Sequence, residues 1–484
     1  MLQRKDITNL GELKNLLLRK EKAVDVMVDF ISFFEFKTVL RRLDIIKKKG
    51  YTPGNLLSIL TLLPFLGQTS IYALLKSGYS YLSDAQKDTY YRLKNNPQIN
   101  WRHILCLFAK RYHKMVSQKE EVSSQEPTCM IIDDTFLAKK GKKIEKVGKV
   151  WDHVVHRYLL GFKLLCLGWY DGKNFIPLDF SLHREKGKKI KRPYGLTSKE
   201  HKLQFSKPRE EKSPSMERIK EIDEKKTDTA LRMIKRAVRH KFIPAYILMD
   251  SWFSCEKLIT GIRGIKKQNI HIVAMLKMGI AKYTVDGKQY TAKQLLSKNK
   301  HAKKRCRKLN ATYIELKVDY KGIPLKLFFS RYGKKGDWHL VGITNRSLSF
   351  IKAMEVYQVR WTIEVFFKEA KQYLGLGSCQ SNDLDAHFAD ITITMMQYIL
   401  LSLKKRFDAY ETKGELFRAS QKEILEVTLK ERLWLLLIEI VEMLGKLLDI
   451  DVVELMNSIL NDQSSNQVLR KLFRLEDEGI QSAA

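Results

Sequence analysis

The chain has 484 residues, of which 44% are hydrophobic, and carries a formal net charge of +34 with a pI near 9.7. This composition excludes a disordered tail and leaves room for two or three domains with sizeable cores. The charge favours a polyanionic partner, through phosphate neutralisation and counterion release. Residues 408–484 contain 15 Asp/Glu against 9 Lys/Arg, a net of −6, so residues 1–407 carry +40. We expect residues 1–407 to bind nucleic acid and the C-terminal region not to.

The six cysteines are scattered and form no Cys-x-x-Cys pair, which argues against a zinc module and favours a reducing compartment. The N-terminal segment MLQRKDITNL has no apolar core of a signal peptide, and the longest apolar stretch, Leu433–Ile438, stops at Glu439. We therefore expect no membrane association and a cytoplasmic chain with access to the chromosome.

Residues 1–120 read as helices separated by Gly, Pro and Asn. The expected helices are Phe36–Lys49, Asn55–Leu66, Ser70–Lys76 and Trp101–Met115. Around Gly67, with Thr69 as a plausible N-cap, the spacing resembles a helix-turn-helix, and an ordinary helical hairpin is an equal alternative. The tract at 87–105 mixes aromatic and basic residues, which suits either a DNA contact or a solvated helix face.

After a polar linker at 117–127 the pattern changes to strands alternating with helices, which indicates an α/β fold. A basic, Pro-containing stretch at 186–216 is expected to be a mobile loop, and a helix is expected at 217–241. Between His271 and Thr344 short β-runs return, before a long helix from Leu384 to Arg406. The expected strands are Cys129–Ile132, Tyr158–Tyr170, Phe175–Leu182 and Ala245–Met249.

A helix through residues 357–374 has two distinct sides. Its apolar side is formed by Val359, Ile363, Phe366, Ala370 and Leu374. The opposite stripe, roughly 100° wide, carries aromatic and charged residues that packing does not require. These are Tyr357, Arg360, Trp361, Glu364, Lys368 and Lys371. The stripe is therefore a candidate working surface.

The Y-(2)-R-(3)-E-(6)-K spacing of this stripe resembles the signature of bacterial insertion-sequence transposases of the DDE type, which have an RNase H-like core. MIIDDT at 130–135 is similar to the first-aspartate strand of that group, and ILMDSWFS at 247–254 to the second. The separations of 117 residues from Asp133 to Asp250 and 114 from Asp250 to Glu364 also suit the group.

The resemblance implies an organisation in three parts. Residues 1–120 would be a helical domain that binds DNA ends. Residues 127–400 would be the RNase H-like catalytic core, with a β-rich insertion at about 278–346. Residues 408–484 would be a helical dimerisation region, although the leucine stripe at 431–448 suits an intramolecular core as well. The implied partners are double-stranded DNA, as transposon ends and target, and a second copy of the chain on two ends.

The resemblance also assigns Asp133, Asp250 and Glu364 as catalytic residues that hold two Mg²⁺ ions, with Mn²⁺ as a possible substitute. Hard carboxylates are the ligands that such ions prefer, and two ions activate the nucleophile and stabilise the leaving oxygen. Each residue has an ordinary alternative. Asp134 would face the opposite side of a strand from Asp133 and is the other candidate for first ligand. Asp250 could cap a following helix, and Glu364 could be a solvated side chain.

The remaining residues of the stripe suit DNA binding. Arg360 can form a bidentate fork to phosphate, while Lys368 and Lys371 act as point charges and Tyr357 can donate a hydrogen bond. Trp361 resembles the family aromatic that stacks on a base flipped from the DNA end when a hairpin forms. Trp338 could supply a second aromatic wall or belong to the core, and Trp252 is expected to pack.

These features predict a transposase that performs cut-and-paste transposition at terminal inverted repeats, in a cytoplasmic, nucleoid-associated setting. Two alternatives remain at this point. A metal-dependent nuclease without strand transfer would use the same carboxylates. A catalytically silent DNA-binding protein would be expected to have lost at least one of them, and all three are present.

Overall fold

The computed structural model describes residues 50–77, 80–119, 126–187, 191–265, 269–333 and 336–407, together with Asp462. The expected helix at 36–49 lies outside these residues, as does the C-terminal region from 408 onward except for Asp462. The proposed domain boundaries therefore stay a prediction.

Short helices precede the first strand. They are α4 (Pro53–Leu62), α5 (Ile71–Lys76), η4 (Ser80–Leu82), α6 (Lys87–Lys94) and α7 (Trp101–Lys119). The expected N-cap at Thr69 is wrong by one residue, because Ser70 accepts the capping bond from the backbone of Ala73 at 3.1 Å. Residues 63–70 separate α4 from α5, a longer connection than the roughly 3–4-residue turn of a helix-turn-helix motif. This length argues against a helix-turn-helix, and the alternative of a helical hairpin stays a prediction.

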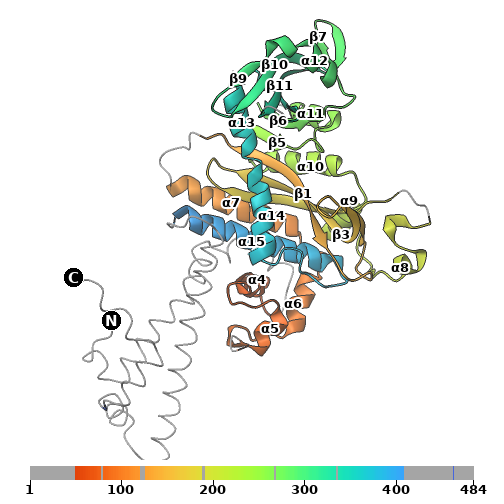
Figure 1. The fold of residues 1–484 in the computed structure, drawn as a ribbon. Coiled ribbons are helices and arrows are strands. Elements are labelled where there is room, and N and C mark those ends of the chain that lie inside the picture. The colour runs from red at the N-terminus through yellow and green to blue at the C-terminus, as the bar shows by residue number, and fades with distance from the viewer. Residues whose placement is uncertain are drawn as a thin grey trace, which may run out of the picture. The chain divides into compact units, whose positions relative to one another are not determined.

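The described part of the chain contains a mixed sheet (Figure 1). Its core strands are β1 (Cys129–Ala138), β2 (Gly148–Asp152), β3 (Arg157–Tyr170), β4 (Phe175–His183), β5 (Tyr246–Met249) and β6 (His271–Leu276). They lie in the order β4-β3-β1-β5-β6, with β3 antiparallel to β1 and β4, and with β5 parallel to β1 and β6. This is the strand order of an RNase H-like fold, which confirms the predicted α/β class.

The β-rich insertion continues the core sheet instead of forming a separate one. Its elements are β7 (Lys282–Val285), β8 (Lys288–Thr291), α12 (Ala292–Lys298), η6 (Lys300–Ala302), β9 (Lys304–Cys306), β10 (Ala311–Tyr320), β11 (Ile323–Tyr332) and β12 (His339–Ile343). β12 pairs antiparallel with β6, and the order then runs through β11, β10 and β7 to β8. The insertion is thereby hydrogen-bonded to the strand beside β5.

Helices cover both faces of the core sheet. Outside the insertion, the α-helices that follow β4 in the chain are α8 (Ser198–Lys202), α9 (Pro214–Glu221), α10 (Lys226–Arg239), α11 (Glu256–Arg263), α13 (Phe350–Gln358), α14 (Trp361–Tyr373) and α15 (Leu384–Phe407). Phe180 of β4 packs against Phe388 of α15, while its neighbour Ser181 bonds Glu221 of α9 on the other side. Because both faces are covered, the run Cys129–Ile132 in β1 is wholly buried.

Within the described ranges, no helix is both long and apolar enough to cross a membrane. All six cysteines are free thiols.

The basic stretch at 186–216 is not a mobile loop in its described part. It contains η5 (Pro193–Gly195) and α8, and its Arg209 side chain is only 2% exposed. The guanidinium of Arg209 pairs with Glu145 at 2.6 Å and with Asp385 at 3.2 Å. These acids lie far away in the sequence, so nothing near Arg209 signals that its side chain is buried. Most other charged residues of this stretch are exposed.

The expected single helices at 217–241 and 357–374 are each divided. The first is α9 followed by α10. The second is interrupted at Val359 and Arg360, where backbone N–H groups bond three residues back instead of four, as from Arg360 to Tyr357 at 3.0 Å. α13 and α14 still follow one another in Figure 1. Of the predicted apolar side, Ile363, Phe366, Ala370 and Leu374 are buried and Val359 is half-buried.

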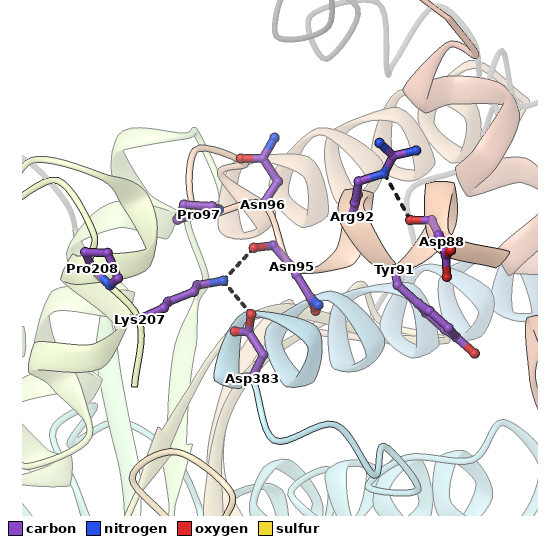
Figure 2. A pocket seen from close by; sticks show the side chains of 9 residues that line it. All are labelled: Asp88, Tyr91, Arg92, Asn95, Asn96, Pro97, Lys207, Pro208 and Asp383. Carbon is purple, nitrogen blue, oxygen red and sulfur yellow. Dashed lines mark hydrogen bonds and ion pairs between the residues drawn. The ribbon is translucent and has the colours of Figure 1, made fainter. Parts of the chain in front are cut away.

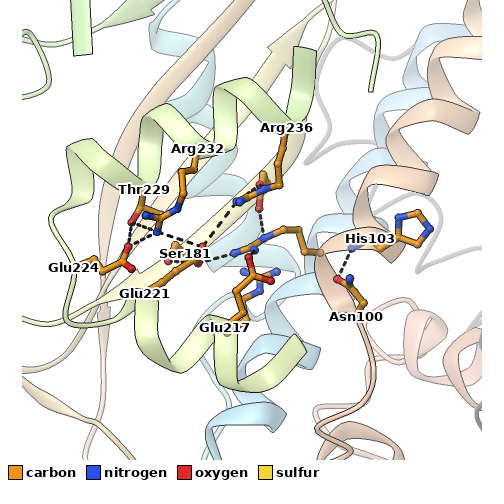
Figure 3. Close-up of polar contacts among 12 residues, drawn as sticks. Asn100, His103, Ser181, Glu217, Glu221, Glu224, Thr229, Arg232 and Arg236 are labelled. Atoms are coloured by element: carbon orange, nitrogen blue, oxygen red, sulfur yellow. Dashed lines mark hydrogen bonds and ion pairs between the residues drawn. The ribbon is translucent and has the colours of Figure 1, made fainter. Parts of the chain in front are cut away.

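A buried ion cluster ties α7 to the sheet and to α9 and α10 (Figure 3). Arg102 of α7 donates to Asp179 of β4 at 3.2 Å and to Glu221 of α9 at 2.5 Å. Arg236 of α10 pairs with the second oxygen of Asp179 at 2.8 Å. The side chain of Glu221 is 2% exposed, so its charge depends on these partners instead of on water.

We predict that Arg102→Met lowers the free energy of unfolding by about 3–5 kcal/mol, because it leaves the buried Glu221 without its nearest ion-pair partner and leaves Asp179 only that with Arg236. Lys142→Met is the matched control, since its pair with Glu200 lies at the surface with 56% of the lysine side chain exposed. Thermal melting of both variants checks this. Similar melting midpoints for the two variants would contradict the structural role of the cluster.

Candidate active site

The pairing of β1 with β5 brings the first two predicted catalytic carboxylates together. The strands are parallel, with Ile132 opposite Met249. Asp133 and Asp250 are the next residues along each strand, and neighbouring strands are about 4.8 Å apart. Asp250 directly follows the end of β5, as expected. Asp133 is not at a strand end, because β1 continues to Ala138 through its pairing with β3.

Arg360 links the first and third carboxylates. Its Nη1 donates to Oδ2 of Asp133 at 2.9 Å, and its Nη2 donates to Oε1 of Glu364 at 2.7 Å. Arg360 is 9% exposed and stands at the start of α14, and Glu364 lies one turn later on the same side. One guanidinium therefore holds together two carboxylates that are 231 positions apart in the sequence (Asp133 and Glu364).

The electrostatic environment of Asp133 is unfavourable to its charged form. Burial raises the pKa of its carboxyl to about 7, against the opposing effect of Arg360. The nearby charges of Asp250 and Asp134 add to the rise. A perturbed carboxyl at a meeting point of three acidic residues is typical of a functional site.

The structure also bears on the two alternatives for these aspartates, a capping role for Asp250 and a ligand role for Asp134. Oδ1 of Asp250 accepts hydrogen bonds from the backbone of Trp252 at 2.8 Å and of Phe253 at 3.2 Å, so this residue does cap the following turn. Asp134 faces away from Asp133 and bonds Lys226, with Lys163 at 3.6 Å. The carboxylate of Asp134 is thus committed to two lysines.

Two aromatic rings flank Arg360. The guanidinium lies 5.8 Å from the ring centroid of Tyr357 and 5.4 Å from that of Trp361. Tyr357 is half-buried, and burial raises the pKa of its phenol. Trp361 is 57% exposed, a large apolar surface for a residue in contact with the buried Arg360.

The two predicted lysines differ. Lys371 donates to Oγ1 of Thr135 at 2.7 Å and to the carbonyl of Phe136 at 2.9 Å, so it attaches α14 to β1. Burial lowers the pKa of this lysine. Lys368 is exposed and makes no hydrogen bond or ion pair in the described part of the chain. Trp338 lies in the insertion, with Arg331 5.3 Å from its ring.

The carboxylates of the candidate site have the chemistry that a divalent cation prefers, but in this structure two of them are bonded to Arg360. Among the described residues, no group of three His, Cys, Asp or Glu side chains is positioned to hold a metal ion. Arg360 bonds both Asp133 and Glu364 instead. The donors are hard carboxylate oxygens, and the raised pKa of Asp133 marks a charge that a cation would stabilise.

The sequence did not single out Lys226, and Trp252 was expected to pack in the core. The structure places the Lys226 ammonium 3.8 Å from the ring centroid of Trp252, beside Asp250, and Trp252 is 42% exposed. The sequence signal that could have indicated a role for Trp252 was its position two residues after a candidate catalytic aspartate.

A separate groove of about 760 Å³ lies beside α6, within the tract considered for DNA contact (Figure 2). Its lysine, Lys207, is bonded to the Asn95 carbonyl at 2.6 Å and to Asp383 at 2.5 Å. Arg92 is matched by Asp88, whose backbone carbonyl accepts from its Nε at 3.3 Å. The lining is therefore balanced in charge, which favours a solvated groove over a phosphate-binding surface.

The strand order and the carboxylates on β1, after β5 and on α14 define an RNase H-like nuclease fold. Residues 56–299, half of the chain, match the family model described as a DDE superfamily endonuclease. Residues 221–400 match a second model, described as a transposase DDE domain. The chain belongs to the DDE superfamily of endonucleases.

Comparison with curated proteins found no match. Among solved structures, the chain is similar to the NurA nuclease from Sulfolobus solfataricus, with 13% identity over 67% of this chain and 100% of that chain. The TM-score is 0.21, so this likeness supports no conclusion about function.

We predict that Asp133→Asn stabilises the metal-free protein more at pH 8 than at pH 5. The carboxyl has a pKa of about 7 when folded and about 4 when unfolded. The folded state therefore binds the extra proton between these values, and stability falls as the pH rises through that window. Asparagine removes this loss, which is at most about 4 kcal/mol.

Melting curves in EDTA across pH 5–8 measure this difference. The pH 5 comparison is the control, because the native carboxyl is already protonated there. If the stability difference between Asp133→Asn and the wild type is constant with pH, or shrinks toward pH 8, the pKa of Asp133 is not raised in the folded protein.

Proposed function

We propose that the chain is a transposase of the group with the Y-(2)-R-(3)-E-(6)-K signature. It cuts DNA at the terminal inverted repeats of an insertion sequence and joins the freed 3′ ends to target DNA. Asp133, Asp250 and Glu364 are its catalytic, metal-binding residues. Its cofactor is a pair of Mg²⁺ ions, for which Mn²⁺ can substitute.

The observation that carries the proposal is the Arg360 bridge. Three segments widely separated in the sequence contribute one acidic residue each, and Arg360 bonds two of these residues while the third lies on the neighbouring strand. Glu364 is 37% exposed and pairs with Arg360 one helical turn earlier. The second bond of Arg360, to Asp133, connects this pair to β1. The family matches add that the chain is of the DDE type.

When bound, the two ions would activate the attacking water or 3′-hydroxyl and stabilise the charge on the leaving oxygen. The protein supplies the rest. Asp133 stands on β1, and Asp250 directly follows β5 with its carboxylate held by two backbone N–H groups, which fixes the direction of each carboxylate. Arg360 orients Glu364 and carries the fork geometry that suits a phosphate oxygen.

DNA contacts extend along α14 from this centre. Tyr357 and Arg360 serve the scissile phosphate, and the free Lys368 serves the flanking backbone. Lys371 attaches α14 to β1 and adds its positive charge to those of Arg360 and Lys368. The exposed ring of Trp361 stacks on a base flipped out of the DNA end.

The proposed partners are double-stranded transposon ends and target DNA, and a second copy of the chain when two ends are brought together. The net charge of +34 favours this partner and a cytoplasmic, nucleoid-associated chain. The matched family is described as an endonuclease, so a nuclease without strand transfer is the alternative function. A strand-transfer assay with pre-cleaved ends separates the two, because the rival should leave such ends unjoined.

We predict that Asp250→Asn and Glu364→Gln each abolish Mg²⁺-dependent nicking at DNA ends and leave DNA binding nearly intact. Each change removes a metal-binding charge at nearly constant shape. Asp133→Asn should behave in the same way, and Asp134→Asn should be milder because its carboxylate is bonded to lysines. Cleavage and gel-shift assays on one labelled end measure both properties.

Near-normal cleavage by the Asp250 or Glu364 variant would remove the two-metal assignment. A stronger defect in Asp134→Asn than in Asp133→Asn would transfer the first-ligand role to Asp134.

We predict that Trp361→Ala leaves first-strand nicking largely unchanged and slows hairpin formation by roughly one to two orders of magnitude. Loss of about 1–3 kcal/mol of base stacking accounts for that factor if the stack forms before the transition state. Trp361→Phe should fall between, because it retains a smaller aromatic face. Time courses of both steps on one labelled end are the measurement.

A melting curve of each Trp361 variant is the control. Because Trp361 is 57% exposed, the alanine variant should melt close to the wild type. Equal slowing of both steps together with a lowered melting midpoint would mean that Trp361 supports the fold instead.

A further inference from the structure

A second exposed tryptophan stands beside the catalytic carboxylates. Trp252 follows Asp250 by two residues, and its backbone N–H donates to Oδ1 of Asp250 at 2.8 Å. This hydrogen bond fixes the start of the turn that carries the indole. The ring is therefore positioned within reach of any DNA strand whose phosphate lies at Asp250.

The surroundings of Trp252 leave part of its ring open. The ammonium of Lys226 lies 3.8 Å from the ring centroid, and Phe253 meets the indole edge-on at 4.9 Å between centroids. With these two neighbours in place the residue is still 42% exposed. An indole whose role was packing would bury this surface, since aromatic rings contribute to stability through the area they bury.

Lys226 is held in position rather than being a free surface lysine. It bonds the carboxylate of Asp134, and its side chain is 14% exposed. Lys163 lies 3.6 Å from the other oxygen of Asp134 and is 6% exposed. Two lysines thus share one aspartate, so the three side chains Lys163, Lys226 and Asp134 together carry a charge of +1, beside an indole that is still 42% exposed.

A partly exposed aromatic ring beside fixed positive charge is the combination that binds single-stranded nucleic acid. The ring stacks on a base, and the ammonium neutralises the adjoining phosphate. Trp361 is joined to the carboxylates through Arg360 on α14, whereas Trp252 is joined to them through the turn after β5. The two indoles therefore approach the acids from different elements.

We propose that Trp252 and Lys226, positioned by Asp134, form a second stacking site that takes an unpaired base of the DNA strand next to the scissile phosphate. This inference rests on the proposed function only in taking DNA as the substrate. It gives Asp134 a defined role, which is to hold Lys226 against the indole.

The test uses the full-length chain in EDTA, so that binding is measured without cleavage. The probe is an oligothymidylate of about 16 nucleotides, a length that suits single-strand binding sites. Tryptophan fluorescence is recorded in a Trp361→Phe background, which removes the other exposed indole of the site. Quenching by the oligonucleotide is expected in this background and should be lost when Trp252→Phe is added.

Affinity is measured in parallel. Trp252→Leu should weaken binding of the single strand by about 10- to 100-fold and of a blunt duplex of equal length much less, because only the single strand offers free bases. Trp252→Phe should retain part of the affinity. Tyr290→Leu is the matched control, since Tyr290 also has a lysine, Lys298, 4.0 Å from its ring, but stands on β8 at the far end of the sheet.

Unchanged quenching after Trp252→Phe, or an equal loss of affinity for single strand and duplex, would overturn the stacking site. The same holds if Tyr290→Leu weakens binding as much as Trp252→Leu. These results are independent of the cleavage assays. Absence of Mg²⁺-dependent cleavage with intact quenching would reject the proposed function and keep the base-binding site.

Discussion

The parallel pairing of β1 with β5 is the constraint on which the arrangement of the candidate site depends. Its register places Ile132 opposite Met249, and the next residue on each strand is an aspartate. Two parallel neighbours need a crossover, and here the crossover contains β3, β4, α9 and α10. A shift of one residue would turn one aspartate to the opposite face of the sheet. This register therefore places Asp250 beside the carboxylate of Asp133 that Arg360 joins to Glu364.

Much of the fold was predictable because its signals are local. The apolar run Cys129–Ile132, the strands around Tyr158–Tyr170 and the long helix from Leu384 all lie where sequence pattern put them. The length of β1 was underestimated. Residues 133–138 are extended by pairing with β3, from Asp133 opposite Cys166 to Ala138 opposite Gly161. Nothing within the six residues themselves signals that partner.

The candidate site was predictable in its acidic residues and less so in their surroundings. Asp250 and Glu364 could be chosen from motif spacing alone. The contacts of Arg360 and Lys226 could not, because each depends on a carboxylate more than 90 positions away in the sequence. The same limit explains the basic stretch at 186–216. Arg209 looks solvated until the fold supplies Glu145 and Asp385.

The extension of the core sheet by the insertion has a consequence for its edges. An RNase H-like sheet that ended at β6 would expose a strand with unpaired backbone groups, which can recruit another chain. Here β12 covers that edge, and the sheet instead ends at β8, a four-residue strand that begins with Lys288. The opposite margin is formed by β2 and β4, which both pair with β3. β2 has only five residues, among them the exposed Lys149, and all nine residues of β4 are buried. Short, charged or covered margins of this kind disfavour strand-to-strand aggregation.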